Sequence, residues 1–359
     1  GWWDDEHFQK YGSTNLAGFE GGTYKRPYET SEKWGKAVTE RGGIPLTYCQ
    51  TGFRSEDYAH AFPEHMLFNS ATAWMDPSYE RPLDDEEFWG NAWRKSFRVW
   101  SFDYTDPEFV KHMQRVYRDF RSGGIKGLMF DYPARGWASG GGMEDRYATT
   151  AGAYRRIFRL ARDGLGDESY LHERNMERGS DITLGLVASQ RTENDTDRIS
   201  PGVVTRCGLR WYKNRVVVNY DTDSKNIYRM REDRDAVRSV LTMSYVTTGR
   251  LLLANSFEQL TPEIVRDMTR VFPFHETPKT ARPVDALTRK YPQIYDFEVT
   301  PQWHQLTLFN SDSENAADIA VTLAGGTAEG CVGLNSEKEH FVYAFCNDRS
   351  AENIAEDKP

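Results

Sequence analysis

The sequence predicts an α/β protein, a (β/α)8 TIM barrel followed by a small C-terminal antiparallel β domain. Apolar runs alternate with amphipathic segments over roughly the first 270 residues, which is typical of parallel strands joined by crossover helices. The strands number about eight when a stub before Trp2 is counted, which favours a closed barrel over an open sheet. After about residue 290 short alternating runs separated by turn residues indicate antiparallel strands.

The first predicted elements are a helix and a strand. Residues 31–41 have a helical period and are followed by two glycines that end the helix, and the apolar run 44–48 reads as a strand. A second strand fits 97–102. Asp106 then caps a helix with Pro107 at its first position. The apolar positions of this helix are Phe109, Val110, Met113, Val116, Tyr117 and Phe120.

The next strand, 127–130 (GLMF), is apolar on both faces, as a strand covered on both sides requires, and Asp131 stands at its carboxyl end. The pattern then predicts a helix over 147–163, strands over 168–173, 182–188 and 216–220, a helix over 232–243 and a last strand over 250–254. Antiparallel strands are predicted over 304–309, 318–323 and 340–345. The predicted domains are therefore 1–285, whose first strand starts truncated, and 286–359.

Composition narrows the function. The net charge of -9 disfavours nucleic acid as a partner, and no run approaches the roughly 18 apolar residues of a membrane span. Aromatic residues make up 13% of the chain, and flat rings with a polar group suit stacking on sugars. No H-E-x-x-H occurs and the four cysteines are far apart, so neither a metal, nor another cofactor, nor a disulfide framework is expected. Oligomeric state and compartment stay open, with a secreted or periplasmic location slightly favoured.

Acids at the carboxyl ends of the predicted strands are the candidates for catalysis, because the active sites of such barrels gather there. They are Asp103, Asp131, Glu173, the cluster Glu193, Asp195 and Asp197, and Asp221 with Asp223. Two carboxylates that face each other across a barrel mouth can cleave a glycosidic bond, at a separation of roughly 5 Å when configuration is retained. Asp131 and one member of the cluster fit this scheme. The alternative is that Asp131 caps a loop and the cluster is a solvated turn.

Six segments, in order, resemble motifs of the alpha-galactosidase (melibiase-like) clan of retaining glycoside hydrolases. They are GWW (1–3), FDYTDPEF (102–109), KGLMFDYP (126–133), ASQRTENDTD (188–197), RWYKNRVVVNYDTD (210–223) and GRLLLANSFEQLTPE (249–263). Past residue 300, LTLFNSDSE and FVYAFCNDR are similar to the clan's C-terminal β-sandwich. The resemblance implies an exo-acting enzyme that cleaves a terminal sugar, such as an alpha-galactoside, from an oligo- or polysaccharide without a cofactor.

The resemblance also assigns catalytic roles. Asp131 takes the nucleophile's place, and Asp195, four residues after Arg191, takes that of the acid/base, with Glu193 and Asp197 as rivals. The chain departs from the clan at Met129, where a lysine is usual, and in the loosened motif 219–223. The first-strand acids that hold a galactose are missing. The reaction type is therefore better supported than the sugar.

Substrate binding is predicted for residues beside strand ends: Trp2, Trp3, Asp103, Trp137, His172, Glu173, Arg174, Arg191 and Asp221. Each has a structural alternative: the two tryptophans could close the barrel, His172 could be a core histidine, and Arg174 could pair only with Glu173. Two further functions remain open, a non-catalytic carbohydrate-binding protein on the same barrel and a transglycosylase.

Overall fold

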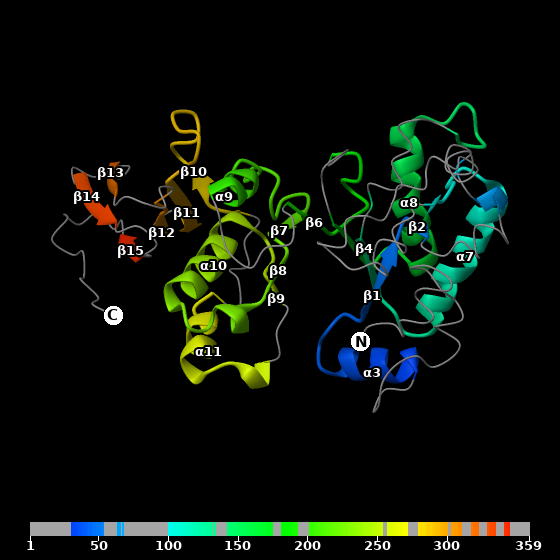
Figure 1. The fold of residues 1–359 in the computed structure, drawn as a ribbon, viewed down its shortest axis with the longest axis horizontal. Coiled ribbons are helices and arrows are strands. Elements are labelled where there is room, and N and C mark those ends of the chain that lie inside the picture. Colours follow the sequence, from blue (N-terminus) through cyan, green and yellow to red (C-terminus); the bar gives the residue numbers. More distant parts are fainter. Residues whose placement is uncertain are drawn as a thin grey trace, which may run out of the picture. The chain divides into compact units, whose positions relative to one another are not determined.

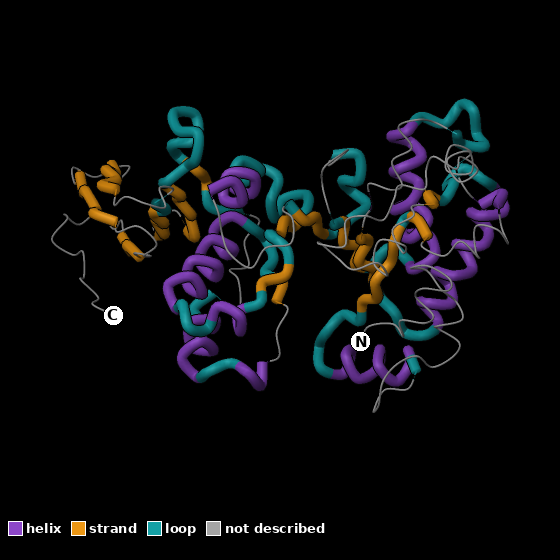
Figure 2. Tube along the Cα trace, in the orientation of Figure 1, coloured by secondary structure: helices purple, strands orange, loops and turns teal. Residues whose placement is uncertain are grey.

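The computed structural model describes residues 30–53, 63–65, 67, 100–131, 133, 142–174, 181–192, 201–253, 257–271, 279–300, 303–310, 317–322, 329–334 and 341–344. The chain divides into two compact units, residues 1–190 and 191–359. Helices and strands alternate along unit 1 (Figures 1 and 2). The predicted boundary between residues 285 and 286 stays a prediction.

The elements of unit 1 are α3 (Ser31–Glu40), β1 (Leu46–Gln50), β2 (Gly52–Phe53), η1 (Pro63–His65), β3 (Trp100–Ser101), α7 (Pro107–Ser122), β4 (Gly127–Asp131), α8 (Thr150–Leu165), β5 (Tyr170–Glu173) and the start of β6 (Ser189–Arg191). The main sheet of this unit is parallel, with the order β1–β4–β5–β6. Its register pairs Phe130 with Glu173, and Glu173 with Gln190. The carboxyl ends of these strands therefore lie along one edge.

Local signals explain the helices of unit 1. Asp106 accepts the backbone N–H of Phe109 at 2.6 Å, and Pro107 occupies the first turn, as predicted. Five of the six predicted apolar positions of α7 are buried; the sixth, Val110, is half-buried. Helix α8 packs against α7, and Gly164 permits the close approach, because a Cβ there would lie 2.4 Å from the Cβ of Tyr117. Phe158 of α8 covers one face of the sheet, with its ring centroid 4.8 Å from that of Phe130.

Two predicted strands of unit 1 differ from the structure. Only Trp100 and Ser101 of the run 97–102 are described as strand, and they pair antiparallel with β2 instead of joining the parallel sheet. The prediction of a strand over 182–188 is wrong: residues 181–186 form turns, and β6 begins at Ser189. The turns persist because Arg155 of α8 donates to the carbonyl oxygens of Ile182 and Leu184, groups that a strand would use in its ladder.

Unit 2 begins with α/β elements and ends with antiparallel strands. The first part contains α9 (Pro201–Gly208), β7 (Asn219–Asp221), β8 (Ser224–Lys225), η4 (Ile227–Met230), α10 (Arg234–Thr247), β9 (Leu252–Leu253), η5 (Phe257–Gln259) and α11 (Pro262–Thr269). Strands β8 and β9 pair in parallel. The strand predicted over 216–220 is confirmed only from Asn219 onward, since Val216 and Val217 lie in an exposed turn.

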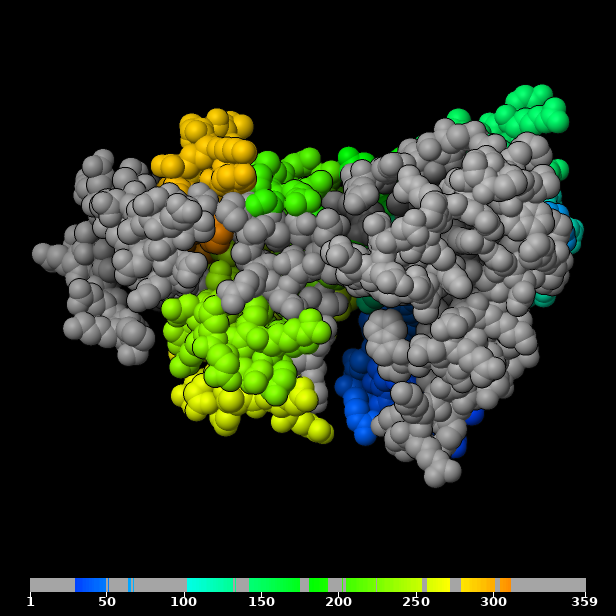
Figure 3. All heavy atoms as spheres, in the orientation of Figure 1, coloured from blue at the N-terminus to red at the C-terminus, as the bar shows by residue number. Residues whose placement is uncertain are grey.

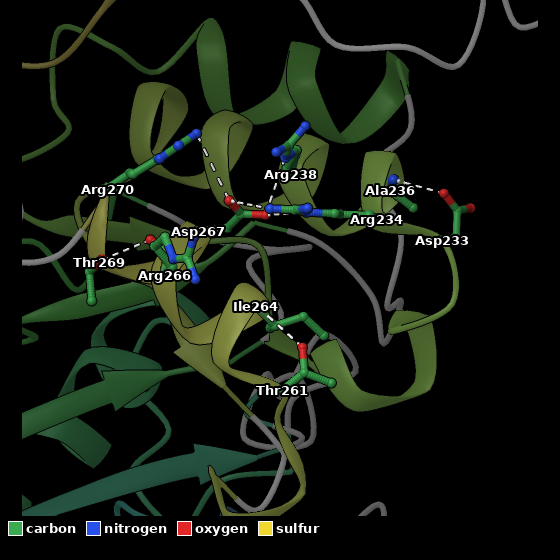
Figure 4. A network of polar contacts seen from close by, with 10 residues as sticks. All are labelled: Asp233, Arg234, Ala236, Arg238, Thr261, Ile264, Arg266, Asp267, Thr269 and Arg270. Carbon is green, nitrogen blue, oxygen red and sulfur yellow. Dashed lines mark hydrogen bonds and ion pairs between the residues drawn. The ribbon is translucent and has the colours of Figure 1, made fainter. Parts of the chain in front are cut away.

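Helices α10 and α11 are joined by an apolar core and by one acid, whose polar contacts are drawn in Figure 4. Val237, Val240 and Leu241 pack with Ile264 and Met268. Asp267 is 3% exposed, and its carboxylate accepts two hydrogen bonds from Arg234, at 2.9 and 3.2 Å, and one from Arg238, at 3.2 Å. This bidentate geometry fixes the two helices relative to each other.

The second part of unit 2 contains β10 (Arg282–Pro283), β11 (Ile294–Thr300), β12 (Trp303–Leu308), β13 (Ala317–Thr322), β14 (Glu329–Leu334) and β15 (Phe341–Ala344). One antiparallel sheet has the order β10–β11–β12–β15, and β13 pairs with β14. Tyr295 and Phe297 of β11 pack against Met243 and Val246 of α10. The predicted antiparallel strands are confirmed; closure of a barrel and a two-sheet sandwich stay predictions.

Candidate functional site

Asp131 ends β4 at the carboxyl edge of the parallel sheet of unit 1. Its side chain is 10% exposed, and one carboxylate oxygen lies 3.4 Å from Nη1 of Arg174, the residue that follows β5. The backbone N–H of Arg174 donates to the carbonyl of Phe130 at 3.0 Å, so the ladder itself places the arginine beside the acid. The structure thus brings together two of the predicted site residues, a nearly buried carboxylate and a guanidinium.

Alternation along the strands decides which residues share the face of Asp131. Because paired residues of parallel strands point to the same side, Met129 and Asp131 share a face with His172 and Arg174. Phe130 and its partner Glu173 point to the opposite face, which α8 covers. The sheet therefore separates the predicted residues into two groups.

His172 lies below Arg174 on the Asp131 face. It is fully buried, and its Nδ1 lies 2.7 Å from Oγ of Ser189 on β6. The hydrogen bond orients the imidazole ring under the carboxyl edge of the sheet. Because His172 is fully buried, a ligand or a water can contact its ring only from the carboxyl edge of the sheet.

Glu173 lies among polar side chains on the α8 face. Its carboxyl accepts hydrogen bonds from Tyr154 of α8, from Thr183 and, at 2.8 Å, from Gln190. Burial raises the pKa of Glu173, and the three hydrogen bonds oppose the shift without cancelling it. These contacts are those of a buried structural carboxyl, on the face away from Asp131. They do not include Arg174, the pairing considered from the sequence.

Asp103 follows β3 and organises a loop. One carboxylate oxygen accepts the backbone N–H and the hydroxyl of Thr105 at 2.8 and 2.7 Å, and the other accepts the N–H of Glu144 at 2.6 Å. The residue is 2% exposed. Three donors of the chain itself therefore use the carboxylate, which ties the segment before α8 to the turn before α7.

Unit 2 carries a second group of buried charges, at the ends of β6 and β7. Nη1 of Arg191 lies 3.0 Å from Oδ1 of Asp223, and each side chain is 3% exposed. Thr192, the next residue, donates its backbone N–H to the carbonyl of Asp221 at 2.9 Å. Arg191 is thus held by a buried ion pair with Asp223, which the sequence named only among the acids at strand ends.

Asp221 is fully buried beside this pair. Its Oδ1 accepts the backbone N–H of Asp223 at 2.9 Å, and its Oδ2 lies 3.9 Å from Nη1 of Arg250. Burial raises the pKa of Asp221, and Arg250 opposes the shift. Asp223 has a φ of 76°, in the left-handed region, where non-glycine residues are uncommon and often belong to functional sites.

Sequence reasoning missed several of these polar residues: Tyr154, Thr183, Gln190, Lys225 and Arg250. None of them directly follows a predicted strand end: Arg250 lies just before β9, and the others lie within a helix, a turn or a strand. Lys225 is completely buried on β8, a position that its sequence neighbours do not reveal. The pattern of acids at strand ends indicates the carboxyl edge of the sheet, but it does not indicate the side chains that hydrogen-bond or pair with these acids.

Several predicted site residues lie outside the described residues: Trp2, Trp3, Trp137, Glu193, Asp195 and Asp197. Their roles stay predictions. Within the described ranges, no group of three or more His, Cys, Asp or Glu side chains is arranged to hold a metal ion. In the same part of the chain, every helix is too short or too polar to cross a bilayer.

Comparison with solved structures identifies the fold. An isomalto-dextranase from Arthrobacter globiformis T6, solved with panose, superposes with a TM-score of 0.59 at 12% identity, over 88% of this chain and 61% of that chain. A GH27 β-L-arabinopyranosidase from Geobacillus stearothermophilus gives 0.60 at 11% identity, over 87% and 76% of the two chains. A GH31 sulfoquinovosidase from E. rectale gives 0.50 at 11% identity, over 88% and 52%.

No family model and no curated protein matches the sequence. The chain spans 61% of the length of the isomalto-dextranase and 52% of that of the sulfoquinovosidase. At such low identities the likeness concerns the fold. The resemblance to the alpha-galactosidase-like clan that the motifs indicated is confirmed at that level: this chain shares its fold with glycoside hydrolases.

Proposed function

We propose that the protein is a retaining glycoside hydrolase that removes a terminal sugar, an alpha-galactoside or a related glycoside, from an oligo- or polysaccharide. The observation that carries the proposal is the position of Asp131, nearly buried at the carboxyl end of β4 and 3.4 Å from the Arg174 guanidinium. The shared fold with an isomalto-dextranase and an arabinopyranosidase supports it. We assign Asp131 as nucleophile and Asp195 as acid/base.

The reaction proceeds by double displacement. A carboxylate oxygen of Asp131 attacks the anomeric carbon while the bond to the leaving oxygen breaks, and Asp195 gives that oxygen its proton. Asp195 then takes a proton from water, whose oxygen attacks the same carbon and releases Asp131. Protonation and carboxylate attack balance the reaction, so no redox partner or metal enters these steps.

Arg174 has two functions in this scheme. Its positive charge holds the Asp131 carboxylate in one orientation by Coulomb attraction in a site with little solvent. We infer that the same guanidinium also binds sugar hydroxyls at this edge, since it carries five N–H donors. Met129 lies on this face, at the position where the clan usually has a lysine that binds sugar hydroxyls. We infer that Arg174, on the same face, binds these hydroxyls in place of the lysine.

The remaining predicted binding residues differ in the support that they have. His172 shares the face of Asp131, and Arg191 and Asp221 lie at the ends of β6 and β7. Trp2, Trp3 and Trp137 remain proposed stacking surfaces for the sugar. For Asp103 and Glu173 we infer supporting roles, because hydrogen bonds from the chain itself use their carboxylates.

A panel of aryl glycosides tests the proposal, with an alpha-galactoside, an alpha-N-acetylgalactosaminide and a beta-L-arabinopyranoside as first members. Turnover should fall at least about a thousandfold in Asp131→Asn, since the nucleophile is lost. Asp167→Asn removes an exposed acid of the same unit and should retain full activity. Equal activity of both variants would refute the assignment of Asp131.

Two alternative functions have distinct outcomes. A transglycosylase would transfer the sugar to an added acceptor sugar, which product analysis separates from hydrolysis. A non-catalytic binding protein would bind a sugar without turnover or covalent adduct with any member of the panel. Either result would replace the proposed hydrolysis.

A further inference from the structure

Exposed apolar side chains gather on two turns of unit 2. Among the described residues, seven of the eleven exposed large hydrophobic side chains belong to segments 209–217 and 284–287. We name this set the turn surface: Leu209, Trp211, Tyr212, Val216, Val217, Val284 and Leu287. Contiguous exposed apolar surface on a folded protein usually marks a site of interaction.

The first turn is held rigidly, so its exposed side chains are presented in a fixed arrangement. Asn214 at its centre is fully buried, donates to the carbonyl of Thr247 at 3.3 Å and accepts the N–H of Tyr220 at 3.0 Å. The N–H groups of Val216 and Val217 both donate to the carbonyl of Lys213, at 3.1 and 3.0 Å. Exposure of the valines is therefore a property of the folded turn.

The second turn is anchored in the same way. Both carboxylate oxygens of Asp285 accept the backbone N–H of Gln293, at 3.2 and 3.0 Å, and the N–H of Val284 donates to the carbonyl of Ile294 at 3.0 Å. Leu287 stands at the tip of this turn and is 102% exposed. A protruding leucine without neighbours gains nothing from folding.

The two turns adjoin each other. The end of α9 touches β11, because a Cβ on Gly208 would lie 2.9 Å from the hydroxyl oxygen of Tyr295. Figure 3 shows the two segments, green and gold, side by side on the surface. The two segments of the turn surface therefore lie near each other in unit 2.

The charge of this region is opposite to that of the chain. Residues 201–220 and 279–295 contain eight Lys and Arg residues and one acid, Asp285, whereas the whole chain has a net charge of -9. Two of these cations, Lys279 and Arg282, pair with Glu298 and Asp296 of β11, and the excess of positive charge remains. The Asp285 side chain is 10% exposed and is used by the turn itself. Basic residues beside the apolar tips include Arg210, Lys213 and Lys290, and Arg289, which pairs with Asp285 at 3.4 Å.

We propose that the turn surface docks on an anionic lipid bilayer. Aliphatic tips flanked by Trp, Tyr and basic side chains match such an interface, because the tips enter the acyl boundary while the cations meet acidic headgroups. Trp211 and Tyr212 could also stack on a sugar, but the aliphatic side chains that make up the rest of the turn surface offer no flat ring for that purpose. The proposal does not depend on the glycosidase activity.

Flotation of the whole protein with vesicles tests the proposal. At low salt the protein should bind vesicles of roughly 70% phosphatidylcholine and 30% phosphatidylglycerol, and it should bind pure phosphatidylcholine little. In about 0.5 M salt binding should be weak, because the screening length, roughly 10 Å at 0.1 M, becomes shorter still. Lys290→Ala should weaken binding about fivefold, as expected for one charge near the surface. Leu287→Asp should weaken it about tenfold or more, since it removes an apolar contact and adds repulsion.

The control is Val265→Asp, which places the same charge at an exposed valine of α11 in the same unit. It should bind vesicles like the unchanged protein. Absence of binding to the anionic vesicles, or equal loss in Leu287→Asp and Val265→Asp, would overturn the proposal. Binding of polygalacturonate without vesicle binding would also overturn the proposal and would identify an acidic polysaccharide as the partner. Self-association in sedimentation that Leu287→Asp abolishes, without vesicle binding, would overturn it and would identify a second copy of the chain as the partner.

Discussion

The Glu173 network predicts a large difference between two substitutions of one residue. In Glu173→Ala, the donors of Tyr154, Thr183 and Gln190 lose their shared acceptor in a fully buried place. An unsatisfied buried donor costs about 1–3 kcal/mol, so three donors with partial relaxation give about 3–5 kcal/mol. Glu173→Gln keeps one oxygen, and the hydroxyls can turn to accept from its amide, so we expect about 1 kcal/mol.

The effect should depend on pH with a defined sign. Burial raises the folded-state pKa of Glu173 above its ordinary 4.5, so folding favours the protonated form. Stability from this residue is therefore complete below pH 4.5 and decreases as pH rises through the folded-state pKa. The free energy of unfolding lost in Glu173→Gln should be larger at pH 4 than at pH 7.

Urea unfolding at both pH values measures these differences. Glu168, in the exposed turn before β5, provides the matched control, and its change to Ala should cost less than about 0.5 kcal/mol. The reasoning fails if Glu173→Ala costs no more than the control, or if the loss in Glu173→Gln increases toward pH 7.

Three further predictions concern the arginine of the site and two buried contacts. Arg174→Lys should lower kcat/KM for a hydrolysed aryl glycoside about tenfold or more, because an ammonium lacks the planar fork of the guanidinium; unchanged kinetics would exclude contact with the reacting sugar. Burial raises the pKa of Asp267, but the hydrogen bonds from Arg234 and Arg238 outweigh burial, so the pKa of Asp267 is lowered. In urea unfolding, Asp267→Asn should therefore cost about 2 kcal/mol of stability at pH 7. The cost should decrease as pH falls below 3.8, because the carboxylate becomes protonated. Burial lowers the pKa of His112 to about 4, and the charges of His65, whose ring centroid is 5.8 Å away, and of Arg115 contribute to the shift. The free energy of unfolding should therefore decrease as pH falls from 6.5 to 4, by at most about 2 kcal/mol after solvent screening. His112→Asn should remove that dependence, and a persisting slope would assign it to other groups.

Local signals in the sequence were sufficient for helices α3, α7, α8 and α10 and for the strand that ends at Asp131, whereas α9 and α11 were not predicted. The Asp106 cap with Pro107, the apolar stripe of α7 and the run 127–130 each act over a few residues, and the structure has all three. The strand ended by Asp131 could be predicted because a doubly covered strand is apolar throughout. Position at the carboxyl edge then follows from the parallel arrangement.

Features that depend on distant residues could not be predicted. The run 182–188 is apolar enough for a strand, but arginines of α8 bind its carbonyl oxygens and stabilise turns. Glu173 ends a strand as Asp131 does, yet the register of β4 and β5 turns its side chain toward α8. Neither segment alone determines that register. The left-handed backbone of Asp223 and its pair with Arg191 likewise depend on tertiary packing.

Trapping the covalent intermediate tests the central proposal most directly. An activated 2-deoxy-2-fluoro glycoside of a sugar that the enzyme hydrolyses should add one glycosyl mass to the intact protein, and peptide mapping should place it on Asp131. The Asp131→Asn variant should gain no mass under the same conditions. An adduct on another residue, or hydrolysis of the parent glycoside without any adduct and with inverted product, would contradict the double displacement through Asp131.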